Sequence, residues 1–450
     1  MTETIEERMR NGTFWSLPRD AFLKVIHAGF SNELDRLRRA PSATERTRTP
    51  DGIATGVSSP SQVLFGKDHD EVNRTLCSIL ATKWIWEKDY KAFTLNQDSG
   101  TRLSIALFQA LADFMRGTAS TVPKQLLVVV LLMIHDLGKD SSLANEITTN
   151  MGGNTGAENH DEVIFEAVRR GLIPCVSMLK AFPREQRGLL LCLQASARLN
   201  IGQLIQAENV PGSLKPVAQL FGGADLVFFD IKFIEFAMDL AGVRGHVSHD
   251  GAQILTQPNV STLIHTHAIL KNVARGKIQL TTAYDAVLHR RAEDLLRAGF
   301  KWTVNDDQVR RALLRIFMMS RTTGKTQANL LVKAGNALPR PLGEELVLAL
   351  NVTGCDEDGK AIIPYYMPAL FSCAFALFKG DTTENHRVAV LASLLRFLAR
   401  ALQGTRPHKA ASEVIEVNLL FAKSTILSEA FHQDPSVLDK LDFPQATCRR

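Results

Sequence analysis

The residues in this chain whose types and spacing are best suited to chemistry are His135 and Asp136, which follow a run of nine apolar residues. The run occupies residues 126–134, and the pair opens the sequence HDLGK, which ends at Lys139. Imidazole and carboxylate groups are costly to bury unless something pairs with them. They are also ligands for hard or borderline cations, and they leave coordination positions of the metal open for water and phosphate. We therefore expect a metal or a ligand beside this pair.

The element that must position the pair is a helix formed by the apolar run. The run is too short to cross a bilayer, which takes about 20 apolar residues, so it predicts a helix buried on most of its surface. Adjacent helical side chains point about 100° apart. A ligand seated at the helix end, where the chain turns at Gly138, would still be within reach of both His135 and Asp136.

A second candidate group opens the next helix and consists of His160, Asp161 and Glu162, with Glu166 one turn further on. Glu162 and Glu166 are four residues apart and so share a helix face. The two carboxylates could act as a base and an orienting group, or they could bind a cationic substrate. The alternative is a helix start exposed to solvent and capped by Asn159 or Asp161.

A third group is a set of acids along a predicted helix at residues 227–239. Asp225 follows a Gly-Gly turn just before this helix and is the best functional candidate of the set. The later acids, Asp230, Glu235 and Asp239, are predicted to be surface or paired charges.

Composition places limits on the protein as a whole. The chain has 450 residues, enough for two or three domains, and its net charge of +5 permits a polyanionic partner without requiring one. Six cysteines without a CxxC motif indicate reduced thiols. The sequence has no apolar core of a signal peptide and no stretch of transmembrane length, so we predict a cytoplasmic protein without a membrane partner.

The periodicity of apolar residues predicts a mainly α fold with three segments. Residues 1–62 would form an N-terminal helix and a flexible basic arm, residues 63–300 a helical core, and residues 301–450 a C-terminal helical region packed on the core. Within residues 351–362 we expect a polar turn, and within 364–432 two or three helices. The other predicted helices span 184–208, 214–241, 259–275, 282–299 and 306–319.

The HDLGK sequence behind an apolar run resembles the signature of the HD superfamily. The resemblance implies an all-helical, HD-domain-like core that hydrolyses phosphate esters with one or two divalent metal ions. Carried over by position, the implied metal ligands are His135, Asp136, His160 and Asp225. The family also has an earlier histidine, but this chain has none between residues 70 and 134, and His69 is the nearest candidate.

A longer resemblance covers most of the chain. HDLGK, a glycine-rich loop, NHDEVIFEAVRRGLIP and DLAGVRGH follow one another as in fungal enzymes that make arginine-containing cyclodipeptides. The resemblance implies a diketopiperazine formed from arginyl-tRNA and a second aminoacyl-tRNA, with charged tRNA as partner, no cofactor and no DNA. The DDxxE motif associated with that group is absent, because the only Asp-Asp pair is Asp306-Asp307.

In the synthase reading the site residues have two roles. The substrate would be bound by His135, Lys139 and Asp225. The predicted catalytic residues are Asp136, His160, Asp161, Glu162 and Glu166.

Three functions therefore remain open. The first is the tRNA-dependent synthase, whose aminoacyl transfer needs no metal. The second is a phosphohydrolase, in which a metal would lower the pKa of a bound water and so produce the attacking hydroxide. The third is a helical scaffold that keeps HDLGK for structural reasons.

Overall fold

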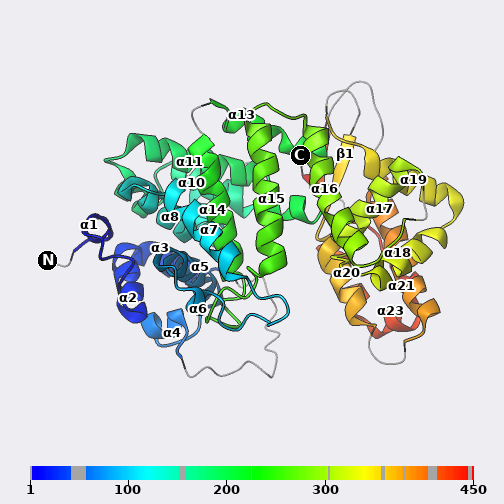
Figure 1. Ribbon diagram of the computed structural model, residues 1–450, viewed down its shortest axis with the longest axis horizontal. Coiled ribbons are helices and arrows are strands. Elements are labelled where there is room, and N and C mark those ends of the chain that lie inside the picture. Colours follow the sequence, from blue (N-terminus) through cyan, green and yellow to red (C-terminus); the bar gives the residue numbers. More distant parts are fainter. Residues whose placement is uncertain are drawn as a thin grey trace. The chain divides into compact units, whose positions relative to one another are not determined.

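The structure is a computed structural model that confirms the mainly α prediction (Figure 1). It describes residues 3–41, 57–151, 159–223, 226–302, 305–355, 360–378, 382–403, 413–443 and 448–449. The chain forms two compact units, which do not follow the predicted boundaries at residues 62 and 300. The first unit comprises residues 1–198 and 220–267, and the second comprises residues 199–219 and 268–450.

The first unit is built from helices, and the division between the two units falls within α15, after His267. Its elements are α1 (Ile5–Arg10), α2 (Arg19–Gly29), α3 (Ser31–Leu37), α4 (Pro60–Phe65), α5 (Asp70–Glu87), α6 (Tyr90–Phe93), α7 (Ile105–Thr118), α8 (Val122–Ile134), η1 (Leu137–Lys139), α9 (Ser141–Met151), α10 (His160–Arg169), η2 (Pro174–Leu179), α11 (Pro183–Arg198), α14 (Leu226–Gly242) and α15 (Gln257–Ala274).

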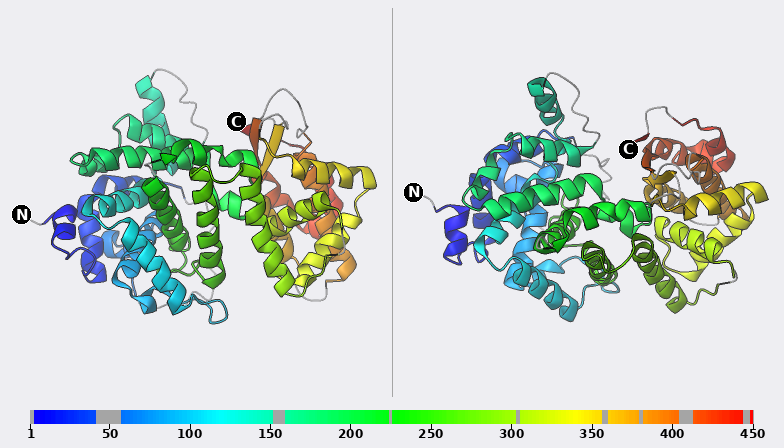
Figure 2. Two further views of the ribbon diagram at one scale, coloured as in Figure 1. Left: turned by 45° about the horizontal axis from the view of Figure 1, so that its top comes forward. Right: turned by 90° about the horizontal axis from the view of Figure 1, so that it is seen from above.

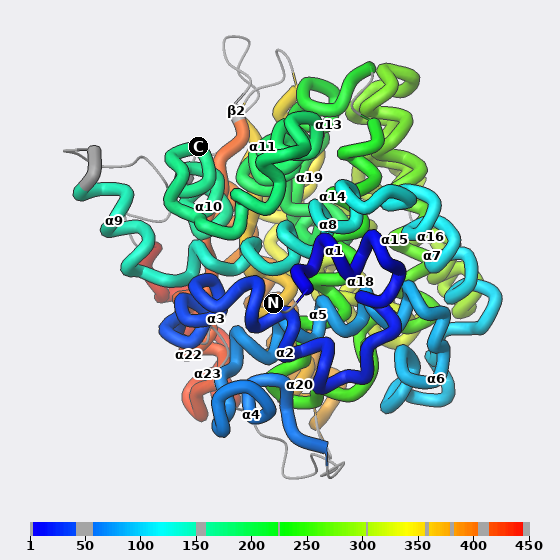
Figure 3. The backbone as a smooth tube through the Cα atoms, turned by 90° about the vertical axis from the view of Figure 1, so that its left-hand side faces the viewer, coloured from blue at the N-terminus to red at the C-terminus, as the bar shows by residue number. Residues whose placement is uncertain are grey.

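The N-terminal segment is more divided than the sequence suggested. Instead of one helix it forms α1, α2 and α3, and Figure 3 shows α2, α3 and α4 grouped together. The predicted flexible arm lies largely outside the described residues, at 42–56. Its end is helical, because Ser59 and Gln62 form a capping box at the start of α4.

Helix α8 is the buried helix that the apolar run predicts. Every residue from Leu126 to Ile134 is buried, and the helix packs on α5, α11 and α14 (Figure 1). Its end at Ile134 delivers His135 and Asp136 into the interior of the first unit.

Helices α5 and α14 pack extensively against each other, and a glycine makes their close approach possible. A Cβ atom on Gly242 would lie 2.4 Å from the carbonyl oxygen of Arg74 and 2.6 Å from the amide nitrogen of Ser78. Both are backbone atoms, so a side chain at this position would push the helices apart.

We therefore expect Gly242→Ala to lower the free energy of unfolding by about 1–3 kcal/mol, the usual cost of overpacking. Gly117 in α7 is the matched control, because nothing lies within 4 Å of its Cβ position. Gly117→Ala should instead stabilise the helix by about 0.5–1 kcal/mol. Urea denaturation of both variants measures the difference, and equal effects would show that the helix crossing tolerates a side chain.

The second unit combines helices with a small sheet. Its elements are α12 (Ile201–Ile205), η3 (Pro211–Leu214), α13 (Lys215–Leu220), α16 (Leu280–Arg297), α17 (Asp307–Met319), α18 (Lys325–Asn336), α19 (Arg340–Asn351), β1 (Lys360–Tyr365), α20 (Met367–Ala376), α21 (Glu384–Ala401), β2 (Glu413–Asn418), η5 (Leu420–Ala422), α22 (Lys423–Ile426), α23 (Glu429–Gln433), η6 (Pro435–Lys440) and β3 (Cys448–Arg449).

The sheet was not predicted, and β1 begins inside the expected polar turn at 351–362. Strands β1 and β2 are parallel, with Lys360 opposite Glu413 and Tyr365 opposite Asn418. Strand β3 pairs with β2 in the antiparallel sense. Figure 2 shows β1 and β2 side by side near the C-terminal mark.

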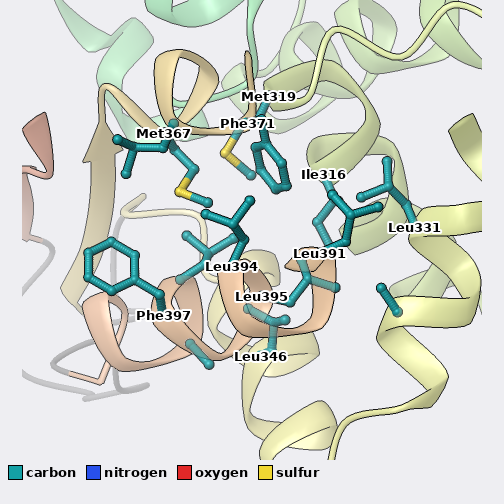
Figure 4. Packing of buried hydrophobic residues seen from close by; sticks show 14 of the residues in the cluster. Ile316, Met319, Leu331, Leu346, Met367, Phe371, Leu391, Leu394, Leu395 and Phe397 are labelled. Atoms are coloured by element: carbon teal, nitrogen blue, oxygen red, sulfur yellow. The ribbon is translucent and has the colours of Figure 1, made fainter. Parts of the chain in front are cut away.

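The core of the second unit is a large apolar cluster formed by its helices and by the buried face of the sheet. Figure 4 shows Met319, Met367 and Phe371 together with leucines of α21 in this cluster. Because these residues are fully enclosed, they hold the start of α20 and the end of α17 in fixed positions.

Within the described residues, no single helix is long and apolar enough to cross a membrane. Helix α7 and the stretch Val122–Lys139 meet that requirement only when taken together, and they are bent by 113°.

Candidate functional site

His135 is held from both sides of its ring at the end of α8. Its Nδ1–H donates to the carbonyl oxygen of Leu132 at 2.7 Å, one turn back along the helix. Its Nε2 lies 2.8 Å from Oδ1 of Asp239, on α14. The two contacts fix the plane of the imidazole, and they show that the acid which reaches HDLGK from α14 is Asp239.

Asp136 is almost completely buried, with 5% of its surface exposed. Its Oδ1 accepts from the ammonium group of Lys139 at 2.7 Å. Its Oδ2 is 3.5 Å from Nε2 of His135 and has no hydrogen-bond partner among the described residues. A buried carboxylate oxygen without a donor costs free energy, so this atom is the unsatisfied acceptor of the site.

Helix α5 supplies a further ion pair to the same group. Glu71 is buried and accepts from Lys139 at 2.8 Å. It also accepts from the guanidinium of Arg74 at 2.9 Å. The site therefore has two cations of its own, Lys139 and Arg74, beside the carboxylates of Asp136 and Asp239.

The electrostatics of the group favour a charged imidazole beside charged carboxylates. Burial is the largest influence on His135 and opposes its charged form, but Asp136 and Asp239 outweigh it and raise its pKa to about 10. Burial likewise opposes the charged form of Asp136, but His135 and Lys139 hold the pKa of that carboxyl well below its usual range. The pKa of Asp239 is lowered in the same way, against burial, chiefly by His135.

The predicted acidic group on α10 lies next to HDLGK in space. A Cβ on Gly138 would sit 1.9 Å from the carbonyl oxygen of His160, so α10 begins against the turn that ends α8. Asp161 is among the acids that raise the pKa of Lys232 on α14, after Glu235, although burial opposes the charged form most strongly. The start of α10 thus faces the same helix that carries Asp239.

The polar side chains at and after the start of α10 have different partners. Asn159 caps the helix as expected, accepting from the backbone nitrogen of Glu162 at 2.9 Å. Nε2 of His160 is 3.7 Å from Oδ2 of Asp161, and the His160 side chain is 41% exposed. Glu166 is bound in ion pairs by Arg169 and Arg170, at 2.8 and 2.9 Å. Glu166 is therefore paired within its own helix.

The residues that could hold a metal ion differ from the set implied by the HD resemblance. Within the described part of the chain, ligand atoms of His135, Asp136 and Asp239 lie within 4.8 Å of one another. His160 and His69 do not belong to this group. Asp225 lies outside the described residues.

The donor set fits a divalent metal only in part. One imidazole and two carboxylates are suitable ligands, but the imidazole nitrogen already contacts Asp239, and Lys139 is bound to Asp136. A metal ion would have to displace the ammonium group of Lys139 and the proton on Nε2 of His135, or bind beside these positive charges. An incomplete ligand set of this kind holds metal less firmly than a complete one.

Sequence reasoning missed the contributions of α5 and α14. Asp239 is a paired charge, as predicted, but its partner is His135, so it belongs to the candidate site, which the sequence did not indicate. A usable signal was the spacing of Lys232, Glu235 and Asp239, which places these three residues on one face of α14. No comparable pattern identified Glu71 or Arg74.

The opposite face of α14 lines an apolar cavity of about 190 Å³ with α7 and α15. His267 lies at its wall and contacts Oδ1 of Asp230 at 2.7 Å. Asp230 is thus a paired charge, as predicted. Helix α14 therefore separates this cavity from the polar side chains around His135.

The comparison with known proteins identifies a family for this helical protein. The chain belongs to the family described as "Family of unknown function (DUF6829)", whose model matches residues 23–438. No curated protein and no solved structure matches the chain.

Proposed function

We propose that the protein is a tRNA-dependent synthase that joins an arginyl group and a second aminoacyl group into an arginine-containing cyclodipeptide. The observation that carries the proposal is the unpartnered Oδ2 of Asp136 in a site whose other carboxylates are already paired with protein cations. Such an oxygen is an acceptor for an N–H group of a substrate, and the α-amino group of an aminoacyl-tRNA is a donor of this kind.

The reaction needs proton movements that this arrangement can support. The α-amino nitrogen of one aminoacyl group attacks the ester carbonyl of the other, an amide bond forms, and the ester bond to the ribose oxygen breaks. The attacking amine loses a proton and the departing ribose oxygen gains one, so the step is balanced by transfer of that proton between the two substrates. The ionised carboxylate of Asp136 would orient the amine, and the charged imidazole of His135 would stabilise negative charge on the departing oxygen. A second amide bond then closes the ring and releases the second tRNA.

The surroundings agree with a large anionic substrate. Asp239, which contacts His135, is 34% exposed, and His160, at the start of α10, is 41% exposed, so both side chains are accessible to solvent. The net charge of +5 favours approach of a tRNA. Asp161, at the start of α10 beside the HDLGK turn, is a further acid near His160.

The test is product formation by purified protein supplied with arginyl-tRNA and the other aminoacyl-tRNAs, with cyclic dipeptides detected by mass spectrometry. We expect an arginine-containing diketopiperazine, and Asp136→Asn should reduce its rate of formation about 100-fold or more, because the neutral amide lacks the charge that orients the amine and holds His135 protonated. Asp35→Asn, which alters a half-exposed carboxyl on α3, is the matched control and should leave the rate unchanged. Absence of any arginine-containing cyclic product would refute the synthase.

A metal-dependent phosphohydrolase is the second candidate, and the close approach of His135, Asp136 and Asp239 within 4.8 Å favours it. In that case the metal would supply a hydroxide at neutral pH. Elemental analysis of the purified protein tests this candidate. About one equivalent of a divalent metal that is lost in Asp239→Asn would support it, whereas a metal-free protein that is inactive on phosphate esters would eliminate it.

A further inference from the structure

A second set of ionisable side chains lies entirely within the second unit, near the carboxyl ends of the parallel strands β1 and β2. We call it the Glu208 site, and it consists of Glu208, Tyr365, Tyr366 and Glu416. Tyr365 and Glu416 lie on the same face of the sheet, because Tyr365 pairs with Asn418 and side chains alternate along a strand. The carboxyl ends of parallel strands are a common place for ligand binding in open sheets.

The loop that carries Glu208 is built around a buried arginine. Arg315 on α17 is 1% exposed. Its guanidinium donates to the carbonyl oxygens of Ala207, Glu208 and Asn209 at 3.3, 3.3 and 3.0 Å. Ala207 has a φ of 55°, in the left-handed region that alanine rarely adopts. The fully buried guanidinium thus holds this strained loop in one shape. Strained backbone that is held in this way is typical of functional sites.

Glu208 itself is 2% exposed. Its carboxyl group faces the backbone nitrogens of Tyr366 and Met367, at the start of α20. Its Oε1 has no hydrogen-bond partner among the described residues. A role as a helix cap explains one oxygen of the carboxyl group, but the other is buried without a donor.

The charges around Glu208 do not neutralise it. Burial is the main cause that raises its pKa, to about 8, and Glu416 adds to the effect, whereas the two backbone nitrogens and Arg321 oppose it. Arg321 is exposed, and its guanidinium donates to the side-chain oxygen of Gln206 at 3.0 and 2.7 Å. Glu416 is half-buried and accepts from Gln203 at 2.8 Å.

The two tyrosines add an aromatic surface to this acidic site. The ring centroids of Tyr365 and Tyr366 are 3.9 Å apart, and both side chains are half-buried. Tyr366 has a φ of 71°, so its backbone is held in the left-handed region immediately before α20. Aromatic faces attract cations, and guanidinium groups stack on them particularly well.

We propose that the Glu208 site binds a planar cation of the guanidinium type, which donates hydrogen bonds to Oε1 of Glu208 and to Glu416 and lies against the tyrosine rings. A guanidinium presents several N–H donors in one plane and so can donate to two carboxylates at once.

The test is isothermal titration of the full chain with methylguanidinium at pH 7, in two buffers that differ in ionisation enthalpy. We expect saturable binding with release of close to one proton, because Glu208 is mostly protonated in the free protein and charged in the complex. Methylurea has a similar planar shape but no charge, and methylammonium has the charge but no planar fork. Both should bind at least tenfold more weakly.

Two variants locate the binding. Glu208→Gln and Glu416→Gln should each weaken methylguanidinium binding at least tenfold, and Glu344→Gln, at an exposed carboxyl of the same unit, should not. Glu416→Gln leaves the contact with α20 intact, so it keeps the test valid if Glu208→Gln fails to fold. The inference would be overturned if the native protein did not bind methylguanidinium. It would also be overturned if a folded Glu208→Gln or Glu416→Gln variant bound it unchanged, and Glu208 would then be a helix cap only.

The outcome is distinguishable from that of the proposed function. Cyclodipeptide formation without methylguanidinium binding would overturn the inference alone. Binding of methylguanidinium without any cyclodipeptide product would overturn the synthase and leave the cation site standing.

Discussion

Replacement of Asp136 by alanine is expected to lower the free energy of unfolding by about 3–5 kcal/mol, the range found when one partner of a buried ion pair is removed. The variant would leave the buried ammonium of Lys139 with one acidic partner instead of two, and the imidazolium of His135 with Asp239 alone. Urea denaturation near pH 7 measures the change.

The control for Asp136→Ala is Asp35→Ala, because Asp35 and its partner Arg38 are 54% and 38% exposed. An exposed pair of this kind should contribute less than about 1 kcal/mol. Equal stability of Asp136→Ala and the native protein would mean that the ion pairs around HDLGK do not support the fold. Asp136→Asn then separates the two roles, since the scaffold hypothesis requires it to affect stability without abolishing an activity.

The contribution of Glu208 to the free energy of unfolding is expected to fall as the pH rises from about 4.5 to about 8, because Glu208 binds its proton more tightly in the folded protein. The pKa of Glu208 is raised from 4.5 to about 8. Between these values the unfolded chain is deprotonated at this position while the folded chain is not, so the contribution is complete below about 4.5 and is lost toward 8. The loss should approach about 4 kcal/mol.

The contribution of Glu208 is isolated by comparing unfolding free energies of the native protein and Glu208→Gln at several pH values. Other groups titrate equally in both, so only the difference is informative. We expect the difference to change by several kcal/mol across this interval, whereas Glu344→Gln should show no such change. A native profile parallel to that of Glu208→Gln would show that Glu208 titrates normally in the folded state.

The local pattern of the sequence was sufficient to locate the main helix of the candidate site. The apolar run before His135 predicts a buried helix because no amphipathic face is present, and α8 is buried along this run. The same reasoning gave Asn159 and Asp161 as candidate caps of α10, since capping depends on residues three positions apart, and Asn159 is the one that caps it. The HD-like core and the synthase activity that the resemblances imply remain proposals.

The partner of His135 was decided by tertiary packing. The sequence favours Asp225 of the acids near α14, whereas the acid that contacts His135 is Asp239, on a helix that packs against α5 at Gly242. Glu71 and Arg74 join the same site from α5, more than 60 residues before HDLGK. Local periodicity cannot predict that these residues come together, because their contact depends on which helices pack against each other and at which residues they cross.

The sequence by itself determined the helical class, the burial of α8 and the presence of a His-Asp pair at its end, because these follow from short-range spacing and hydrophobicity. Only the tertiary structure determined that β1 and β2 pair in parallel and that Arg315 holds the loop at Glu208. Strand pairing and burial of a charge depend on contacts between residues far apart in the chain, and their free energy arises only when the whole unit is assembled.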